Sequence, residues 1–347
     1  MEILHSGWEC PSNIALIKYW GKLPGQIPCN PSLSITLDRA HTQTRITATP
    51  QQSRFPNLHV QFNGEHAPTL ETKLTGFIQS IVQEHPWILS YHLHIDTENS
   101  FPHGAGIASS ASGMGALGLG LCDLQRQLEG GLHDASFFQK ASHLARLGSG
   151  SASRSVYGGY VTWGEIPEVT HSSNLYASPL EAPVHQVFQR WQNDILIVDP
   201  AEKKVSSTAG HGLMKTNPFS QNRFAQAYTH IQELIQAISH GNVEKFITLV
   251  EAEALTLHAM MMTSQPNYLL MRPGSVLAIE KIRDFRQQTG TPVCFTLDAG
   301  PNVHILYPMA VKDRVQPFIQ EELMSALPGA RLLSDHLGTG PRYLGNA

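Results

Sequence analysis

The stretch PHGAGIASSASGMGALGLGLCDL, Pro102–Leu124, concentrates small side chains where a helix is expected to begin. In one interpretation its head, from Gly104 to Ser110, is a loop entering a helix whose free N–H groups bind an anion. In the other, the small residues let the helix pack tightly against a sheet. A glycine inside a helix costs about 1 kcal/mol relative to alanine, so the four glycines between positions 113 and 120 indicate tight packing. The head of the stretch favours the anion.

Familiar nucleotide and nucleophile motifs do not explain this stretch. The chain has no G-x-x-x-x-G-K-[ST], no G-x-S-x-G and no H-E-x-x-H sequence. The pattern G-x-G-x-x-G does occur at Gly113–Gly118, but it falls inside the expected helix. A dinucleotide fingerprint belongs at a strand-to-helix turn, so we interpret this match as chance.

The composition indicates a compact globular protein. Of 347 residues, 41% are hydrophobic and 15% charged, with a formal net charge of -4 and no basic block, which argues against nucleic acid as a partner. The cysteines are far apart and form no C-x-x-C pair, so we expect no disulfide framework and a reducing, cytoplasmic compartment. The first residues do not resemble a secretory signal, and no apolar run approaches the roughly 18 residues of a membrane span.

Periodicity predicts an α+β protein in two parts, divided around residue 190. The first part should contain strands at residues 32–37, 42–49, 58–65, 90–99 and 155–164, with helices at 73–85 and 136–148. In the second, a strand at 191–200 precedes helices at 222–241, 242–262 and 274–290 and a strand–turn–strand unit at 292–307.

Four further polar features each have two interpretations. Arg154, in the turn ARLGSGSASRS, could bind a carboxylate or phosphate or be an ordinary surface arginine. Lys18, in the apolar run NIALIKYWGK, lies either at an edge or beside a buried anionic partner. Asp298, in TLDAGPNVH, caps a turn or acts as a carboxylate in a cleft. The segment VSSTAGHG, residues 205–212, is expected to be a third Ser/Thr/Gly loop, which either binds phosphate or is simply solvated. We interpret the scattered histidines as structural or surface residues.

Together these segments resemble a known family. PHGAGIASSASG resembles the phosphate-binding motif of the GHMP kinase superfamily. The stretches NIALIKYWGK, NPSLSITLD, GSGSASRSVYGGYVTW and FTLDAGPN, in that order, are similar to the mevalonate diphosphate decarboxylase family, as is DILIVDPAEKKVSSTAGH. The resemblance covers Trp8 to about Tyr307. It implies an N-terminal mixed α/β domain (residues 1–190) and a C-terminal ferredoxin-like α+β domain (191–347), with the active site in the cleft between them.

The resemblance also implies an activity. Members of this family use ATP and Mg²⁺ to convert (R)-5-diphosphomevalonate to isopentenyl diphosphate, with ADP, phosphate and CO₂, in the mevalonate pathway of isoprenoid biosynthesis. The alternatives are a decarboxylase of 5-phosphomevalonate, a GHMP small-molecule kinase such as a mevalonate 3-kinase, and a binding protein without catalysis. Because this chain keeps both Lys18 and Asp298, decarboxylation is favoured over a kinase.

The same resemblance assigns residues by motif position. Asp298 would be the catalytic carboxylate, with Lys18 as its partner. Substrate-binding residues would be Tyr19, Lys22, Ser149, Gly150, Ser151, Arg154 and Thr208, and the loop at 102–113 would bind ATP through Gly106, Ser109, Ser110 and Ser112, with Ser207. Arg154 could instead clamp the substrate carboxylate. The ligands of Mg²⁺ are not identified. Family members often form homodimers, although no apolar stripe in this sequence marks an interface.

This chain departs from the family pattern in three places. After WGK it carries the short LPGQIPCNPSLS where many relatives have an acidic insertion. Ser153 stands where a cysteine is common. Lys73 lies roughly where relatives offer an arginine to the diphosphate.

Overall fold

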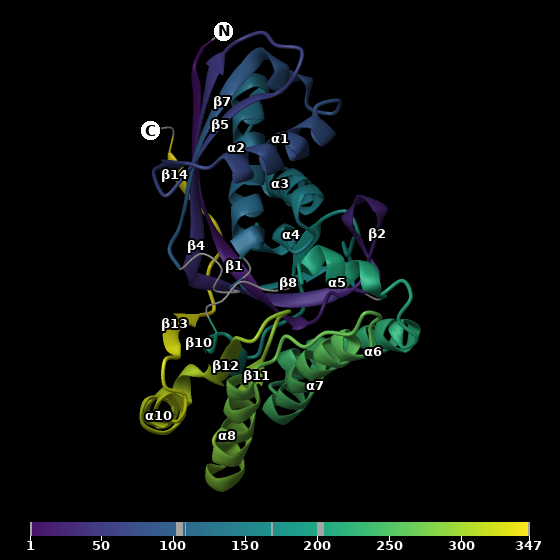
Figure 1. The fold of residues 1–347 in the computed structure, drawn as a ribbon, viewed down its shortest axis with the longest axis vertical. Helices are drawn as coiled ribbons and strands as arrows, with labels where there is room; N and C mark the ends of the chain where they lie inside the picture. The colour runs from purple at the N-terminus through teal and green to yellow at the C-terminus, as the bar shows by residue number, and fades with distance from the viewer. Residues whose placement is uncertain (1, 102–106, 108, 168, 200–204, 346–347) are drawn as a thin grey trace.

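A computed structural model describes residues 2–101, 107, 109–167, 169–199 and 205–345. Within these residues the strands form two large sheets, one above the other in Figure 1, and helices flank both. The mixed α+β architecture predicted from periodicity is therefore confirmed. None of the helices described is long and apolar enough to span a bilayer.

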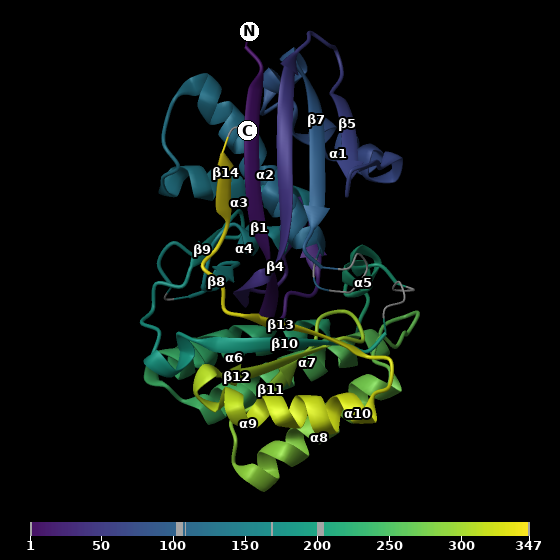
Figure 2. The ribbon, with the colours of Figure 1, turned by 90° about the vertical axis from the view of Figure 1, so that its left-hand side faces the viewer.

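The first sheet has eight strands, with the order β14-β1-β4-β7-β5-β6 and with β8 and β9 attached to β4. All neighbours are antiparallel except β5 and β7. Helices cover one face of this sheet, and its other face carries none (Figures 1 and 2). The strands are β1 (Leu4–Ile17), β4 (Ser32–Pro50), β5 (Asn57–Phe62), β6 (Glu65–His66), β7 (Tyr91–Asn99), β8 (Tyr160–Trp163), β9 (Ala177–Pro179) and β14 (Arg342–Gly345); the helices are α1 (Pro68–Ile81), α2 (Ser109–Glu129), α3 (Ala135–Gly148) and α4 (Ala152–Ser155).

Helix α2 contains most of the small residues noted in the sequence, and its packing tests the two interpretations of that stretch. Its body is buried from Ala111 to Leu124 with one half-buried position, Gly113. At Gly118 a Cβ atom would lie 3.1 Å from main-chain atoms of Ala141 and Ala145 on α3, so the two helices could not pack this closely around a larger residue. The tight-packing interpretation therefore holds for the body of the helix, and anion binding by the head of the stretch stays a prediction. The body packs tightly, whereas Ser109 and Ser110 at its first turn border a cavity.

The second sheet is antiparallel with the order β11-β12-β10-β13. Its strands are β10 (Trp191–Ile197), β11 (Cys294–Thr296), β12 (Val303–Pro308) and β13 (Arg331–His336). The helices of this half are α5 (Ser207–Leu213), α6 (Ser220–His240), α7 (Val243–Met262), α8 (Pro273–Thr289), α9 (Lys312–Pro317) and α10 (Met324–Ala326). A two-stranded ribbon, β2 (Lys22–Leu23) with β3 (Ile27–Pro28), completes the fold.

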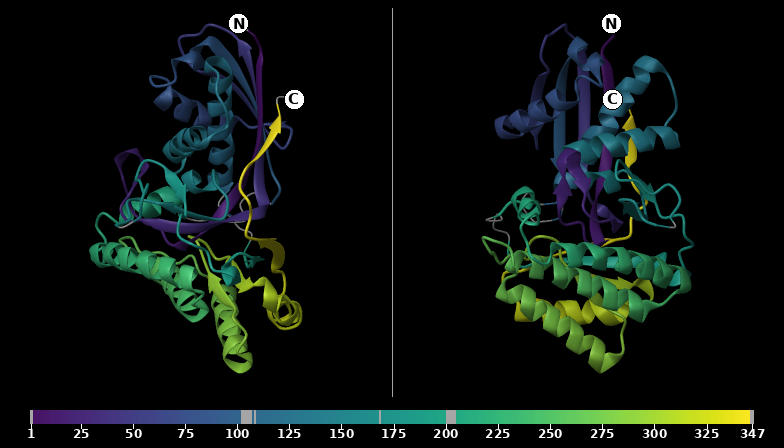
Figure 3. Two further views of the ribbon diagram at one scale, coloured as in Figure 1. Left: turned by 180° about the vertical axis from the view of Figure 1, so that it is seen from behind. Right: turned by 90° about the vertical axis from the view of Figure 1, so that its right-hand side faces the viewer.

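A shared core joins the two sheets. Ile14 and Leu16 of β1 belong to the same buried cluster as Ile195 of β10 and Ile231 of α6. The last strand, β14, returns to the first sheet and pairs with β1, which Figure 3 shows as the yellow strand beside the purple one. The chain thus crosses between the halves more than once, and the division around residue 190 stays a prediction.

Two predicted elements differ from the structure. The expected strands at residues 32–37 and 42–49 are one continuous strand, β4, because its Asp38–His41 stretch stays extended; the main-chain N–H groups of Asp38, Arg39 and Ala40 donate to the carboxylate of Asp335. The expected loop at 205–212 contains a helix, α5, whose N-terminus is capped by the Ser206 hydroxyl accepting from the Ala209 N–H.

Candidate active site

A cavity of about 470 Å³ opens where β1 ends. Its walls come from the first turn of α2, the turn between α3 and α4, the start of α5 and the loop after β11. Most of the predicted site residues line it: Lys18, Tyr19, Lys22, Ser109, Ser110, Ser149, Gly150, Ser151, Arg154, Ser207, Thr208 and Asp298. Segments nearly 300 positions apart in sequence therefore meet at one site.

Lys18 and Asp298 form an ion pair at this cavity. Lys18 follows the last residue of β1 and its side chain is 1% exposed, whereas that of Asp298 is 31% exposed. The ammonium donates to Asp298 Oδ1 at 3.0 Å and to the Ala15 carbonyl at 2.7 Å. Burial lowers the pKa of Lys18, and Asp298 acts in the opposite direction by stabilising the ammonium. The interpretation of Lys18 as an edge lysine is thus wrong.

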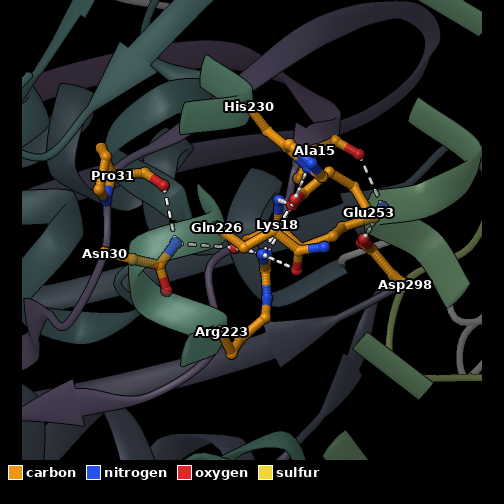
Figure 4. Close-up of polar contacts among 9 residues, drawn as sticks. All are labelled: Ala15, Lys18, Asn30, Pro31, Arg223, Gln226, His230, Glu253 and Asp298. Atoms are coloured by element: carbon orange, nitrogen blue, oxygen red, sulfur yellow. Dashed lines mark hydrogen bonds and ion pairs between the residues drawn. The ribbon is translucent and has the colours of Figure 1, made fainter. Parts of the chain in front are cut away.

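A buried network holds the main chain of Lys18 in place (Figure 4). Glu253 of α7 accepts the Lys18 N–H at 2.8 Å, and Arg223 of α6 donates to the Lys18 carbonyl at 3.1 Å. Arg223 also binds both carboxylate oxygens of Glu253, at 2.9 and 2.6 Å, and His230 lies 2.7 Å from the same group. Burial alone would raise the pKa of Glu253, but Arg223, His230 and the Lys18 N–H together lower it. These helices therefore fix the point from which the Lys18 side chain extends.

Arg154 is a second buried cation in the lining, and its partners are neutral. Its guanidinium donates to the hydroxyls of Ser34 and Ser32 at 3.1 and 2.5 Å and to Asn13 Oδ1 at 3.4 Å. Within the described ranges, no carboxylate forms an ion pair with it. Burial lowers the pKa of Arg154 to about 10, so it stays charged at neutral pH. The charge of Asp298 offsets part of this burial without forming an ion pair with Arg154. Because burying an incompletely compensated charge is costly, the arrangement fits an anionic ligand.

Close packing shapes the wall beside Arg154. A Cβ atom at Gly150 would lie 2.8 Å from the Trp163 ring and 3.0 Å from the Tyr19 hydroxyl. The Arg154 guanidinium lies 5.7 Å from the centre of the same indole. Gly150 therefore lets the turn approach the aromatic wall, which brings Ser149 and Ser151 to the cavity.

His211 is a lining residue that sequence reasoning did not single out. It is buried between Tyr19 and Trp20, with ring centroids 4.3 and 4.4 Å away. The Gly21 N–H donates to His211 Nδ1 at 2.9 Å, so the proton of the neutral ring resides on Nε2. Burial, followed by the charge of Lys22, lowers the pKa of His211 to about 3. The ring is therefore a neutral donor at the cavity wall. It ends the family-like stretch DILIVDPAEKKVSSTAGH, but it was passed over because all histidines were interpreted as structural or surface residues.

The predicted ATP residues fall into three groups. Ser109 and Ser110, at the first turn of α2, border both the main cavity and an adjoining, largely apolar cavity of about 420 Å³. Ser112 is fully buried and lines neither cavity, and its hydroxyl lies 2.6 Å from that of Thr42, which borders the apolar cavity. Gly106 and half of the predicted phosphate loop at 102–113, namely residues 102–106 and 108, lie outside the described residues. Lys73, which sequence comparison placed only loosely, borders both cavities.

Other lining residues and supports were also missed. Asn13, Trp20, Gln26 and Leu257 line the cavity, and His258 of α7 lies 3.1 Å from the main-chain carbonyl of Asp298. Asn13 lies in β1, and Leu257 and His258 lie in α7, where periodicity predicts core packing. Trp20 and Gln26 lie in the short connections after β1, where no periodic pattern applies. Only the three-dimensional arrangement distinguishes them.

Comparison with known proteins gives consistent matches along the chain. The model of the diphosphomevalonate decarboxylase-like N-terminal domain matches residues 10–174, and that of the mevalonate 5-diphosphate decarboxylase C-terminal domain matches residues 194–333. The diphosphomevalonate decarboxylase of Ganoderma lucidum is 31% identical over 97% of this chain and 86% of its own length. The enzyme of Aspergillus fumigatus is 33% identical over 86% of this chain and 75% of its own.

Solved structures agree with the sequence matches. The mevalonate diphosphate decarboxylase of Staphylococcus aureus superposes with a TM-score of 0.83 at 28% identity, over 99% of both chains. A complex of MDDEF with MVAPP, AMPPCP and magnesium gives the same score, identity and coverage. The fold and the cavity thus define a two-part α+β enzyme with a site for anionic small molecules between its halves. The chain belongs to the diphosphomevalonate decarboxylase family.

Proposed function

We propose that this chain catalyses the ATP- and Mg²⁺-dependent decarboxylation of (R)-5-diphosphomevalonate to isopentenyl diphosphate in the mevalonate pathway. Family membership and the neighbour in complex with MVAPP, AMPPCP and magnesium support the assignment. The observation that carries the mechanism is the ion pair of the buried Lys18 with the partly exposed Asp298, which borders the same cavity as the buried Arg154.

The chemistry requires a better leaving group at C3 of the substrate. A tertiary hydroxide leaves poorly and phosphate leaves well, so the 3-hydroxyl is first phosphorylated by ATP. Departure of that phosphate develops positive charge at C3. The C–C bond to the substrate carboxylate then breaks, its electrons form the alkene, and CO₂ is released. The site must therefore orient the hydroxyl, stabilise charge at C3 and hold the carboxylate.

Asp298 suits the first two tasks. Its carboxylate is partly exposed to the cavity, while Lys18 is buried behind it. Lys18 and the Arg223–Glu253 network fix the Asp298 oxygen before substrate arrives, so little reorganisation is needed in the transition state. In this proposal Asp298 accepts a hydrogen bond from the 3-hydroxyl and later faces the cationic C3.

The part of the lining around Arg154 suits the anionic ends of the substrate. Arg154 offers a planar set of donors that can bind two oxygens at once, and Ser149, Ser151 and Tyr19 lie beside it. Lys22 and Thr208 border the same space. We assign this wall to the 5-diphosphate and the carboxylate, with Arg154 contacting one of them.

The two adjoining cavities fit the two halves of ATP. The first turn of α2 offers N–H groups and the hydroxyls of Ser109 and Ser110 to phosphate oxygens, with Ser207 across the cavity. The neighbouring apolar cavity, lined in part by Leu70 and Leu117, suits a nucleoside. Hydroxyl oxygens beside phosphates are ligands that Mg²⁺ accepts. When bound, Mg²⁺ would neutralise phosphate charge, and Ser109 and Ser110 are the residues placed to hold it.

The test is a product assay with two substrates side by side. The chain is mixed with ATP, Mg²⁺ and either 5-diphosphomevalonate or 5-phosphomevalonate, and ADP and CO₂ are measured separately. We expect equal amounts of both products with the diphosphate. ADP without CO₂ would identify a kinase, CO₂ only with the monophosphate would change the substrate, and neither product would leave a binding protein.

Cellular context is part of the proposal. Four free cysteines, three of them buried, suit a reducing compartment, and we propose the cytoplasm. A homodimer, suggested by the family resemblance, stays a prediction that sedimentation can check.

A further inference from the structure

Outside the cavity, three metal-binding side chains converge at one margin of the first sheet. His59 lies on β5 and His66 on β6, and Glu71 lies in the first turn of α1. The donor atoms of all three lie within 4.8 Å of one another. We call these three residues the edge cluster. None of them lines the catalytic cavity.

The distances within the edge cluster suit one small cation. Glu71 Oε2 lies 3.1 Å from His66 Nε2 and 3.7 Å from His59 Nδ1. In a tetrahedral zinc site with bonds of about 2.0–2.1 Å, neighbouring donor atoms are roughly 3.3–3.4 Å apart. The two separations from Glu71 lie on either side of that value, and the donor atoms of the two histidines lie within 4.8 Å of each other, so side-chain rotations could place all three donors around one ion.

Surrounding contacts orient the donors. The Val60 N–H donates to Glu71 Oε2 at 3.0 Å, which fixes the carboxylate at the strand edge. The His59 ring stacks on His66 and on His94, with centroids 4.9 and 5.0 Å away. Hydrogen bonds and packing that hold a ligand in position typically raise metal affinity. The cluster is therefore partly arranged in advance.

A simple hydrogen bond does not account for the whole cluster. The contact between His66 and Glu71 would satisfy that pair alone, and exposed ion pairs contribute little stability. It leaves His59 Nδ1 at 3.7 Å from the carboxylate, too far for a hydrogen bond. Two imidazole nitrogens with one carboxylate oxygen are typical ligands of zinc and similar ions, whereas Mg²⁺ prefers oxygen.

We propose that the edge cluster binds one Zn²⁺ ion, or a similar first-row divalent ion, with water completing the coordination. The ion would tie the β5–β6 hairpin to the start of α1. Because the segment between His66 and Glu71 includes Ala67–Leu70, which borders the apolar cavity, the ion would also steady that wall. This role is structural and independent of the decarboxylation proposed above.

The test uses the untagged, full-length chain after removal of bound metal. Titration with ZnCl₂, followed by calorimetry, should give one saturable site per chain. His59→Ala, His66→Ala and Glu71→Gln should each weaken that site by at least about tenfold, whereas His240→Ala, which removes an exposed histidine at the end of α6, should not. Zn²⁺ should raise the melting temperature of the wild type and not of the three cluster variants.

Cobalt provides a second readout that does not depend on affinity. Co²⁺ bound to this cluster should give the intense visible absorption of a four-coordinate site, and Glu71→Gln should lose it while circular dichroism stays unchanged. Only weak, unsaturated Zn²⁺ binding by the wild type would overturn the proposal. Equal effects of His240→Ala and the cluster variants would overturn it too.

Discussion

Lys18 and Arg154 are both buried cations at one cavity, but the protein treats them differently. Lys18 has a carboxylate partner, Asp298, and its main chain is held by Glu253 and Arg223. Among the described residues, Arg154 donates hydrogen bonds only to hydroxyl and amide oxygens, and the charge of Asp298 stabilises it without forming an ion pair. Burying a charge is costly unless an opposite charge compensates it. The fold supplies that charge for Lys18, and the anionic substrate would supply it for Arg154.

The difference suggests a division of labour. Lys18 has its charge partner, Asp298, without any ligand, which suits a pair that must be in position when charge develops at C3. Within the part of the chain that the structure describes, Arg154 would form an ion pair only when an anion binds, which suits recognition of the anionic substrate. Changes on the first side should therefore act on kcat and stability, and changes on the second should act on substrate binding.

The largest effect is expected for Asp298→Asn. Asparagine keeps the shape and can still accept from Lys18, but it lacks the negative charge that stabilises C3. We expect kcat to fall by about 10²–10⁴-fold, with the dissociation constant of ATP within a few-fold of wild type. Turnover is measured as ADP and CO₂ release, and nucleotide binding by calorimetry. A variant with wild-type kcat would refute this role for Asp298.

Glu253→Gln should act mainly by weakening the network of Glu253 and Arg223 that holds the main chain of Lys18. Breaking a buried ion pair typically lowers the free energy of unfolding by about 3–5 kcal/mol, and the displaced Lys18 should lower kcat. Because the pKa of Glu253 is lowered in the folded chain, its stabilisation is present above the ordinary glutamate value of 4.5 and is lost as pH falls below it. Urea unfolding at neutral pH and near pH 4 should show the difference between wild type and variant shrinking.

Glu251→Gln is the matched control for that substitution. Glu251 also lies on α7 and pairs with Arg283 and Arg286 of α8, away from the cavity lining. We expect reduced stability and unchanged kcat. If both variants lowered kcat equally, a specific role for Glu253 in positioning Lys18 would be lost.

Arg154→Lys should raise KM for the substrate by about 10- to 100-fold, equivalent to about 1.4–2.8 kcal/mol. A lysine keeps the charge but cannot bind two oxygens in the same plane. Steady-state kinetics with varied substrate test this, and Arg146→Lys is the control, since Arg146 donates to the carbonyls of Leu175 and Gly25. An unchanged KM for Arg154→Lys would contradict the assignment.

The smallest effect concerns His211. An ordinary histidine titrates near pH 6.5, but the pKa of His211 is lowered to about 3. Its NMR resonances, assigned with His211→Asn, should therefore stay constant between pH 5 and 8. A midpoint within that range would mean that His211 becomes a cation beside the substrate, and the neutral-donor description would fail.

Sequence motifs identified the residues that line the cavity better than the buried residues that support them. Lys18 and Asp298 stand out because each interrupts an apolar run, and the family resemblance paired them across 280 positions. Glu253 and Arg223 lie within long amphipathic helices, where charged residues are usually exposed, so nothing in the sequence marked them as buried partners. Ser112, a small polar residue assigned to ATP from the motif, is fully buried against Thr42, and its contact with ATP stays a prediction.

Long-range pairing explains the remaining misses in the fold. The last strand, β14, pairs with β1 more than 300 positions away, and local periodicity carries no information about such a partner. Residues 205–212 have loop composition, yet Gly210 fits against Trp20 only because α5 packs there. Elements with strong local patterns, such as α6 and α7, were predicted nearly to their ends.

The most direct test of the central claim is a crystal structure with (R)-5-diphosphomevalonate and a non-hydrolysable ATP analogue. We predict that Asp298 lies within hydrogen-bonding distance, about 2.5–3.0 Å, of the 3-hydroxyl oxygen, while Arg154 contacts an anionic group of the substrate. A complex in which the 3-hydroxyl lies against another residue and Asp298 contacts only Lys18 would contradict it.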